Sequence, residues 1–281
     1  MTIGIAGLGL IGGSFAKAIA KYTDYTILGF DISHETIEKA TKDSSIHGLL
    51  DSTTIPNCDI IIVALYPAAS IDFVKKHAGI IPKGAIVSDC SGTKRQICAE
   101  LFPLSQRYGF HFIGGHPMAG LERSGYDNST AELFSGASMI LCPDPSAENT
   151  PLEKLTALCH ACRFAAVTIS TAEKHDELIA YTSQLAHIVS SAYIKSPLSV
   201  QHHGFSAGSF KDMTRVAFLN EEMWTELMIE NRDYLKPALD ALITRLSQYR
   251  DALSGADTRA LFALLREGKE IKQLSEKLDH E

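Results

Sequence analysis

Residues 3–14 read IGIAGLGLIGGS, an apolar run that leads into three glycines at positions 7, 9 and 12. The β-branched residues predict a buried strand over Ile3–Ala6, and a helical pattern follows over Gly12–Lys21. Gly7 permits the tight turn between them, Gly9 lets the backbone approach a ligand, and Gly12 lets the helix pack closely on the strand. A strand, a turn and a helix in this order are typical of the first unit of a doubly wound α/β sheet.

The glycine-rich turn and one acidic residue further on predict a dinucleotide site. Amide hydrogens at the N-terminus of the helix suit a pyrophosphate. Asp31 ends the second predicted strand, 19 positions after Gly12, where its carboxylate would accept hydrogen bonds from ribose hydroxyls and repel a 2′-phosphate. A glycine-rich turn without a ligand is the alternative, and the position of Asp31 argues against it. We therefore predict NAD, held by Gly7, Leu8, Gly9, Leu10, Ile11, Gly12 and Asp31.

Short β-branched runs alternate with helical patterns up to Ile169, which predicts a parallel sheet covered by helices on both faces. Beyond Thr171 the pattern is helical, with breaks expected at Ser196-Pro197, His203-Gly204, Lys236-Pro237 and Ser254-Gly255. We predict an α/β fold in which an NAD-binding Rossmann domain over 1–169 precedes an all-helical domain over 170–281. The expected strands are Ile3–Ala6, Tyr25–Phe30, Asp59–Ala64, Ala85–Ser88, Phe110–Ile113, Ser138–Leu141 and Ala165–Ile169.

Composition limits the partners of the chain. Its 281 residues are 45% hydrophobic and 21% charged, which is the balance of a folded globular protein. A formal charge of −7 with a pI near 5.9 argues against binding to nucleic acid or to an anionic membrane. No run is apolar enough to cross a membrane, and the N-terminus lacks the basic residues of a signal peptide. Six scattered cysteines then indicate reduced thiols, so we predict a cytoplasmic protein.

Ligands of open α/β sheets bind beyond the carboxyl ends of the strands, so residues in those turns are candidates for the site. Leu65 and Pro67 follow the third expected strand and are predicted to line the cofactor cleft. Ser91 and Thr93 follow the fourth, where an N-cap role explains them as well as contact with a ligand does. His116 lies in GGHPMAG, expected to be a loop after the fifth strand, and histidine is the side chain best suited to accept a proton near neutral pH.

The helical half carries two further groups of polar side chains. Asp176, Ser183 and His187 fall on one stripe of a predicted helix, and such a stripe is either solvated or lines a cleft. Lys211 and Arg215 could hold a carboxylate, with the Arg215 guanidinium as a bidentate fork. These residues would give an acidic chain the local positive charge that an anionic substrate requires.

Two other patterns are interpreted as structural. Cys159-His160-Ala161-Cys162 ends a predicted helix and lacks a second cysteine pair, so we predict neither a metal site nor a redox site there. The C-terminal leucines, among them Leu227, Leu235, Leu246 and Leu265, are expected in the core. The excess of apolar helix faces for a domain of this size favours a homodimer.

Four motifs in order resemble the prephenate dehydrogenase family: GLGLIGGS at 7–14, GGHPMAG at 114–120, TSQLAH at 182–187 and FKDMTR at 210–215. The resemblance spans nearly the whole chain and implies a Rossmann domain followed by a helical dimerisation domain. It also implies NAD-dependent oxidative decarboxylation of prephenate, a small anionic dicarboxylate, to 4-hydroxyphenylpyruvate in tyrosine biosynthesis. Aromatisation of the ring makes the step irreversible.

The resemblance assigns roles to individual residues. It implies that His116 contacts the ring hydroxyl, that Ser183 and His187 contact the substrate, and that Arg215 holds a carboxylate. Glu122 matches a glutamate near the pocket entrance. One departure concerns the turn DCSGTK, in which many members carry a serine, hydrogen-bonded to the catalytic histidine, where this chain has Gly92. Ser91 or Thr93 could replace it, and Ser91 is the one that we assign to catalysis beside His116.

Three alternatives remain open from the sequence. Arogenate, the amino analogue of prephenate, requires the same chemistry. A β-hydroxyacid dehydrogenase would carry an Asn three or four positions after a Lys on the first helix of the second domain, whereas Lys174 is followed by Glu177 and Leu178. A non-enzymatic NAD-sensing dimer is the third alternative, although a sensor needs no basic anchor opposite its nicotinamide.

Overall fold

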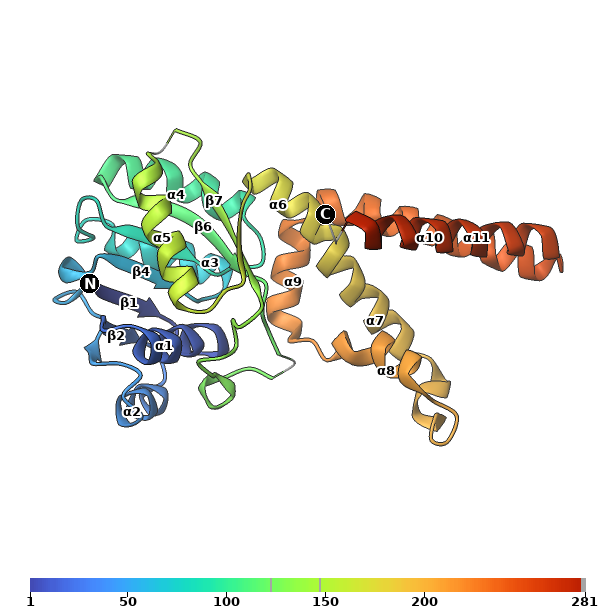
Figure 1. Cartoon of the computed structure of the whole chain (residues 1–281), viewed down its shortest axis with the longest axis horizontal. Coiled ribbons are helices and arrows are strands. Elements are labelled where there is room, and N and C mark those ends of the chain that lie inside the picture. Colours follow the sequence, from blue (N-terminus) through green and yellow to red (C-terminus); the bar gives the residue numbers. More distant parts are fainter. Residues whose placement is uncertain (122, 147, 279–281) are drawn as a thin grey trace. The chain divides into compact units, whose positions relative to one another are not determined.

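The computed structural model describes residues 1–121, 123–146 and 148–278. Its N-terminal part is an eight-stranded sheet in the order β3-β2-β1-β4-β5-β6-β7-β8, with helices on both faces (Figure 1). The predicted α/β fold is confirmed, and the strand order reverses between β1 and β4, where such folds bind ligands. The strands are β1 Thr2–Ala6, β2 Thr26–Phe30, β3 Gly48–Leu49, β4 Ile60–Val63, β5 Ile86–Asp89, β6 His111–Pro117, β7 Ser138–Pro143 and β8 Ala166–Ile169.

Two features of the sheet differ from the predicted parallel sheet of seven strands. Strand β3 has only two residues, which is too short to leave a pattern in the sequence. Strand β7 runs antiparallel to β6, with His116 opposite Ile140. Between β6 and β7 the described residues contain no α-helix, and their one helical element is the short 3-10 helix Tyr126–Asn128. A parallel pair needs a crossover connection, usually a helix, so β7 runs back antiparallel to β6.

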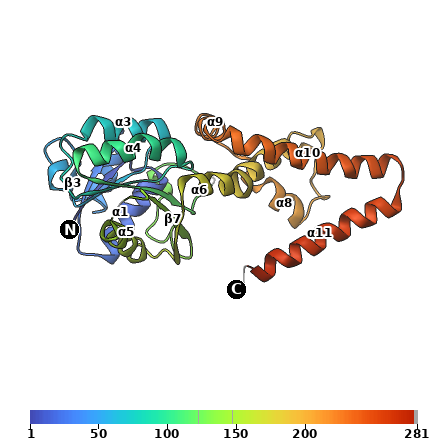
Figure 2. The ribbon, with the colours of Figure 1, turned by 90° about the horizontal axis from the view of Figure 1, so that it is seen from above.

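The helices cover the two faces of the sheet because the strands alternate their side chains between them. Along β4, Ile60 and Ile62 enter one hydrophobic core, while Ile61 and Val63 enter the other. Helices α1 and α5 lie over the first core, and α3 and α4 lie over the second (Figure 2). The helices of this part are α1 Leu10–Tyr22, α2 His34–Lys42, α3 Pro67–His77, α4 Arg95–Tyr108 and α5 Asn149–Ala161.

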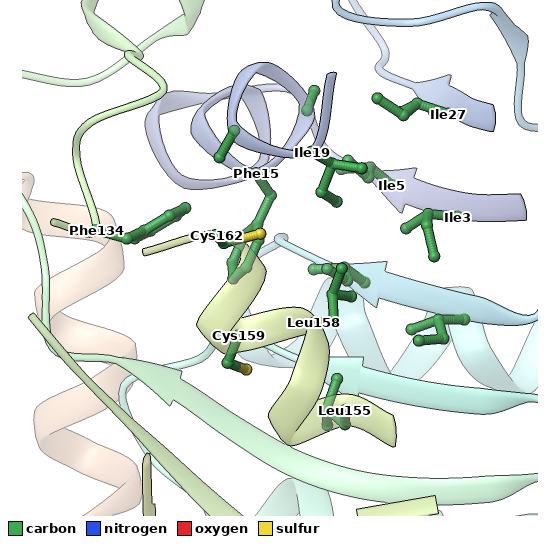
Figure 3. Close-up of a cluster of buried hydrophobic side chains, with 14 of the residues drawn as sticks. Ile3, Ile5, Phe15, Ile19, Ile27, Phe134, Leu155, Leu158, Cys159 and Cys162 are labelled. Atoms are coloured by element: carbon green, nitrogen blue, oxygen red, sulfur yellow. The ribbon is translucent and has the colours of Figure 1, made fainter. Parts of the chain in front are cut away.

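The first core includes the two cysteines of the CHAC sequence. Cys159 and Cys162 are 1% and 0% exposed and lie among apolar side chains of α1 and α5 (Figure 3). Phe134 packs beside them, with its ring centroid 4.4 Å from that of Phe15. Burial raises the pKa of the Cys159 thiol to about 12, and all six cysteines are free. These thiols are therefore protonated core side chains.

The chain divides into two compact units, Met1–Arg232 and Asp233–Glu281, and each is described by itself. The predicted domain boundary at 169/170 coincides with the end of β8, and it stays a prediction. The expected breaks at Ser196-Pro197 and His203-Gly204 are present. The helical elements of the first unit beyond the sheet are α6 Ala172–Ile179, a π turn over Ala180–Leu185, α7 Ala186–Ile194, a 3-10 turn over Pro197–Gln201, α8 Gly208–Thr214, a 3-10 turn over Arg215–Ala217 and α9 Glu221–Glu230.

The second unit consists of α10, which spans Arg232–Ser254, and α11, Thr258–Leu278. The break predicted at Lys236-Pro237 is wrong, because α10 continues through the proline and loses only one hydrogen-bond donor there. Leu246 and Leu265 were expected in the core, but each is 58% exposed. Helices α10 and α11 therefore carry apolar side chains that are exposed rather than buried in a core.

None of the helices in the described ranges is both long enough and apolar enough to span a membrane.

Candidate active site

The glycine turn after β1 leaves room for a ligand at one position only. Gly7 has φ +88°, and a Cβ there would lie 2.5 Å from the carbonyl oxygen of Ala64. A Cβ at Gly12 would lie 1.8 Å from the carbonyl oxygen of Gly7. A Cβ at Gly9, in contrast, meets nothing within 4 Å. Gly7 and Gly12 are therefore required by the fold, whereas Gly9 borders open space at the N-terminus of α1, which fits a pyrophosphate.

The other residues predicted at this turn lie beside that space. Leu8 is buried, while Leu10 and Ile11 are half-buried in the first turn of α1. The Asp31 carboxylate lies just beyond β2 and accepts hydrogen bonds from the Leu8 amide at 2.8 Å and the Ser33 amide at 2.9 Å. The backbone thus holds this carboxylate beside the glycine turn, and each oxygen keeps acceptor capacity for a ribose hydroxyl.

Asp31→Ala is expected to weaken NAD binding by roughly 10–100-fold, since a hydrogen bond to a charged group contributes about 1.5–3 kcal/mol. In the variant the difference between the affinities for NAD and NADP should also become smaller, because the repulsion of the 2′-phosphate is removed. Titration of both dinucleotides by fluorescence would measure the two affinities. Asp24→Ala, which removes an exposed carboxylate before β2, is the matched control and should bind like the parent. Full discrimination in the Asp31 variant would move cofactor selection to other residues.

The turns after β4 and β5 form the next part of the same edge. Leu65 is half-buried, and Pro67 is buried at the first position of α3. Ser91 is 4% exposed; its amide donates to the Asp89 carboxylate, and its hydroxyl has no hydrogen-bond partner in the part of the chain that the structure describes. A buried hydroxyl without a partner fits contact with a ligand.

Gly92, where the resemblance described above implies a serine, is covered by helix α9. A Cβ at this position would lie 3.2 Å from the Leu227 side chain. A serine would therefore press on α9, which supplies a packing reason for the glycine. Thr93, next in the turn, donates from its hydroxyl to the Glu230 carboxylate at 2.6 Å, so it links the turn to α9 rather than capping α4 by a side-chain hydrogen bond.

His116 lies within strand β6, so the expected loop position is wrong. The strand passes close to its neighbours because Gly114 and Gly115 have no side chains: a Cβ at Gly114 would press on Cys98 of α4, and one at Gly115 would press on β5. A Cβ at Gly115 would lie 2.4 Å from the carbonyl oxygen of Asp89, and its amide donates to the Asp89 carboxylate at 3.0 Å. The His116 imidazole is consequently fixed to the sheet near the carboxyl end of the strand.

A second histidine, His175 on α6, contacts His116 directly. The distance between Nδ1 of His116 and Nε2 of His175 is 2.8 Å, and that between Nδ1 of His175 and Oδ1 of Asp176 is 2.7 Å. His175 and Asp176 are 1% and 2% exposed. A continuous chain of hydrogen bonds therefore runs from β6 to a buried carboxylate on α6.

Asp176 also joins α6 to the N-terminus of α4. Its carboxylate accepts hydrogen bonds from the amides of Lys94 at 2.7 Å and Arg95 at 3.0 Å. The Nε of Arg95 donates to the same carboxylate at 3.2 Å, and Asn231 donates to the Asp176 carbonyl at 2.9 Å. Asp176 is thus a buried anchor, although the sequence placed it on a stripe of uncertain exposure.

The electrostatics of this cluster favour neutral imidazoles. Burial, then the neighbouring His175 and Lys94, hold the pKa of His116 well below its ordinary value. Burial likewise lowers the pKa of His175, against the opposing effect of Asp176. The Lys94 ammonium is fully buried and pairs with the Asp89 carboxylate. His116 is therefore unprotonated near neutral pH and free to accept a proton.

Helix α9 places two carboxylates at the same edge of the sheet. Glu226 accepts a hydrogen bond from the Ala68 amide at 2.8 Å, in the first turn of α3. Burial raises the pKa of Glu230, and the hydrogen bond from Thr93 opposes that effect. These contacts hold α9 across the ends of β4 and β5.

A second cluster forms around His187 on α7. The ring of Trp224, on α9, lies 4.0 Å from the His187 ring between centroids, and the distance from Nδ1 of His187 to the Ser183 carbonyl oxygen is 2.8 Å. Burial lowers the pKa of His187, and the positive charge of Arg215 adds to this effect. Lys211 is exposed on α8, one helical turn before Arg215.

Helix α9 relates the two clusters. Trp224 contacts the second cluster and Glu230 contacts the turn beside the first, and six residues of helix correspond to about 9 Å along its axis. The predicted stripe of Asp176, Ser183 and His187 is divided, because a π turn over Ala180–Leu185 changes the helical register and Asp176 joins the first cluster.

Some expectations and omissions concern single residues. Glu122, predicted near the pocket entrance, lies outside the described residues. His175 was missed from the sequence, although an adjacent His-Asp pair at the start of the first helix of the second domain was a usable signal. Within the described ranges, no group of three His, Cys, Asp or Glu side chains could hold a metal ion.

A dinucleotide-type glycine turn at the switch point of the sheet, with a neutral imidazole near the carboxyl end of β6 on the same edge, is typical of a dehydrogenase of the Rossmann class. The model of the prephenate dehydrogenase nucleotide-binding domain matches residues 15–168, and that of the prephenate dehydrogenase dimerization domain matches residues 171–267. The chain belongs to the prephenate dehydrogenase family, and it is an oxidoreductase.

Relatives of known structure or sequence cover almost the whole chain. The prephenate dehydrogenase of Bacillus subtilis is 30% identical over 96% of this chain and 75% of its own length. The structure of Aquifex aeolicus prephenate dehydrogenase in complex with hydroxyphenyl propionate and NAD+ gives a TM-score of 0.84 at 26% identity, over 99% of this chain and 98% of that one. Synechocystis arogenate dehydrogenase gives 0.81 at 25% identity, over 98% and 100%. Relatives that are named for different substrates, prephenate and arogenate, thus share this fold.

Proposed function

We propose that this protein catalyses the NAD-dependent oxidative decarboxylation of prephenate to 4-hydroxyphenylpyruvate in tyrosine biosynthesis. The observation that carries the proposal is the half-buried, neutral imidazole of His116, which lies on the sheet edge that also presents the glycine turn. Arogenate is the alternative substrate, since it requires the same chemistry and an arogenate dehydrogenase shares the fold.

The residues at the glycine turn support NAD as the cofactor. The open space at Gly9 and the Asp31 carboxylate are the features that fit it. Leu65 and Pro67 would line the same cleft after β4. The Aquifex aeolicus relative was solved with NAD+, which favours the same dinucleotide here. When bound, NAD supplies the hydride acceptor of the reaction.

The protein residues handle the proton and the substrate charges. His116 accepts the proton of the C4 hydroxyl as the C4 hydride departs, and the bond between the ring and its carboxylate breaks to release CO2. The electron pair of that bond enters the ring, which becomes aromatic, and the proton held by His116 returns to the phenolate oxygen. No net proton is released. We assign Ser91 to act beside His116, since its buried hydroxyl, in the turn after β5, has no hydrogen-bond partner among the described residues.

The second cluster supplies the charge for a dianionic substrate. Arg215, whose charge acts on His187, would hold a carboxylate, with Ser183 on the preceding π turn and Lys211 on α8 as further contacts. Positioning of this kind lowers the barrier by several kcal/mol, because the reacting groups are held in an attack geometry.

Arg215→Ala is expected to raise KM for prephenate by roughly 10–100-fold, with a smaller change in kcat, because a charged hydrogen bond to a carboxylate contributes about 1.5–3 kcal/mol. Steady-state kinetics at saturating NAD would measure both constants. Lys195→Ala, which removes an exposed cation at the end of α7, is the matched control and should leave KM unchanged. An unaltered prephenate affinity in the Arg215 variant would remove this side chain as the anchor.

The proposed function is tested by offering the purified protein prephenate and arogenate separately, with NAD or NADP. We expect NADH and CO2 in equal amounts from prephenate, and 4-hydroxyphenylpyruvate as the organic product. Turnover of arogenate alone would overturn the substrate assignment, and turnover with NADP alone would overturn the cofactor assignment. Failure of both substrates would overturn the activity itself.

We further propose that the chain forms a homodimer in the cytoplasm. The match to a dimerization domain and the exposed apolar side chains of α10 and α11, among them Ile243, Leu246, Phe262 and Leu265, support a second copy as the partner. The free state of all six cysteines agrees with a reducing compartment. Light scattering would measure the mass in solution, and a monomer at micromolar concentration would contradict the dimer.

A further inference from the structure

The orientation of His116 is not explained by the turn after β5. In that turn Gly92 has no side-chain donor or acceptor, and the hydroxyl of Thr93 is engaged by Glu230. The contact that His116 does make is with His175, at 2.8 Å, with the two rings nearly edge to face at 61°. The identity of the donor and the acceptor in this contact decides which nitrogen of His116 can accept a proton.

The direction of the hydrogen bonds follows from the Asp176 end of the chain. Burial opposes ionisation of Asp176, but the hydrogen bonds from His175 and from the Arg95 and Lys94 amides hold its pKa below the ordinary value. These amides lie at the N-terminus of α4, where the helix dipole also favours a negative charge. Asp176 is therefore a carboxylate, and a carboxylate can only accept hydrogen bonds.

Each nitrogen in the chain then has one possible role. Nδ1 of His175 must carry a hydrogen, because it faces the Asp176 carboxylate at 2.7 Å. A neutral imidazole holds only one hydrogen, so Nε2 of His175 is an acceptor. Nδ1 of His116 must then donate to it, which leaves Nε2 of His116 with its lone pair free. The hydrogen-bond chain selects a single tautomer of His116.

We infer that His175, held by Asp176, is the positioning residue that keeps Nε2 of His116 unprotonated and ready to receive a proton. The role of that nitrogen in catalysis rests on the proposed function, whereas the tautomer itself does not. Once Nε2 has accepted a proton, the positive charge on His116 is spread through Nδ1–H toward His175 and its carboxylate partner. A nucleophile or base held by a histidine and a carboxylate follows the same logic in other enzymes.

The other charged groups around His116 do not supply an alternative partner. Lys94 lies near enough to lower the pKa of His116, but its ammonium pairs with Asp89 on β5. Arg95, on α4, donates to Asp176 and to Asn231. On β7, the residue opposite His116 is the apolar Ile140. The acceptor for Nδ1–H is therefore His175 among the groups described on these elements.

The test compares two variants of His175 that differ in one property. In His175→Gln the side-chain carbonyl can still accept from Nδ1 of His116, whereas His175→Leu has no acceptor. The tautomer is read by 15N NMR of imidazole-labelled protein without substrate, with the His116 signals identified by their loss in His116→Asn. His77→Asn, which removes a half-buried histidine on α3 outside the site, is the matched control and should change neither the His116 signals nor the kinetics.

We expect the Nδ1–H tautomer of His116 in the parent and in the Gln variant, and a mixed or inverted tautomer in the Leu variant. With prephenate and NAD, the Leu variant should lose on the order of 10² in kcat with little change in KM, and the Gln variant should keep most of it. The pH profile of kcat/KM should change shape in the Leu variant only.

An Nε2–H tautomer of His116 in the parent protein would overturn the inference, and so would equal kcat losses in the Gln and Leu variants with an unchanged tautomer. The parent measurement does not depend on His175→Leu, so it decides the question even if that variant does not fold. Inactivity of the parent on both substrates, with the Nδ1–H tautomer observed, would overturn the proposed function and leave the tautomer assignment intact.

Discussion

His116→Asn is expected to lower kcat for prephenate by about 10² or more, with little change in KM. An asparagine keeps a polar side chain beside His175, but it cannot accept a proton near neutral pH. The loss therefore falls on the step in which the C4 hydroxyl proton leaves, rather than on the binding of the substrate. Steady-state kinetics with saturating NAD would measure both constants at neutral pH.

The control for this prediction lies on the same strand. His111→Asn replaces a half-buried histidine at the other end of β6 and should leave both constants unchanged. An equal reduction in the two variants would point to disruption of the strand. A normal kcat in the His116 variant would remove this residue from the mechanism.

Gly12→Ala is expected to destabilise the protein by at least about 3 kcal/mol, because the new methyl group would overlap the Gly7 carbonyl oxygen and force backbone to move. For a protein of this size, such a loss corresponds to a fall in Tm of roughly 6–12 °C. The displaced turn should also lose its affinity for NAD. Thermal unfolding followed by circular dichroism and titration with NAD would measure the two effects.

Gly9→Ala is expected to weaken NAD binding without changing the stability of the fold. Its Cβ meets nothing within 4 Å, and the residue has an ordinary φ of −70°, so the variant should unfold at the temperature of the parent. Its methyl group would occupy the space where a pyrophosphate approaches, so NAD affinity should fall. A Gly12 variant with parental stability would contradict the packing explanation, and a Gly9 variant with parental NAD affinity would place the phosphates elsewhere.

Most of the fold could be predicted because its signals are local. The apolar runs and the three glycines of the first turn determine a strand, a turn and a helix with little help from the rest of the chain. Strand β3 was missed because two residues carry no periodicity, and the antiparallel direction of β7 depends on how the chain returns after Pro117. The break expected at Pro237 is absent, because a single proline removes one hydrogen bond and a long helix tolerates that loss.

The site could be predicted less completely, because its contacts join distant parts of the chain. His116 could be predicted as a site residue, but its position in a strand depends on Gly115, which lets β6 pass close to Asp89. The role of His175 depends on its contact with a residue 59 positions earlier, which no periodicity reveals. The π turn over Ala180–Leu185 likewise divides a stripe that regular helical spacing predicts as continuous.

The placement of His116 on β6 has a consequence for how relatives of this protein can diverge. The imidazole belongs to a strand that is hydrogen-bonded on one side to β5 and on the other to β7. The side chains proposed to hold the substrate belong to helices and short turns outside the sheet. Substitutions on these helices can therefore change substrate specificity, while the sheet keeps the proposed catalytic histidine in the same position.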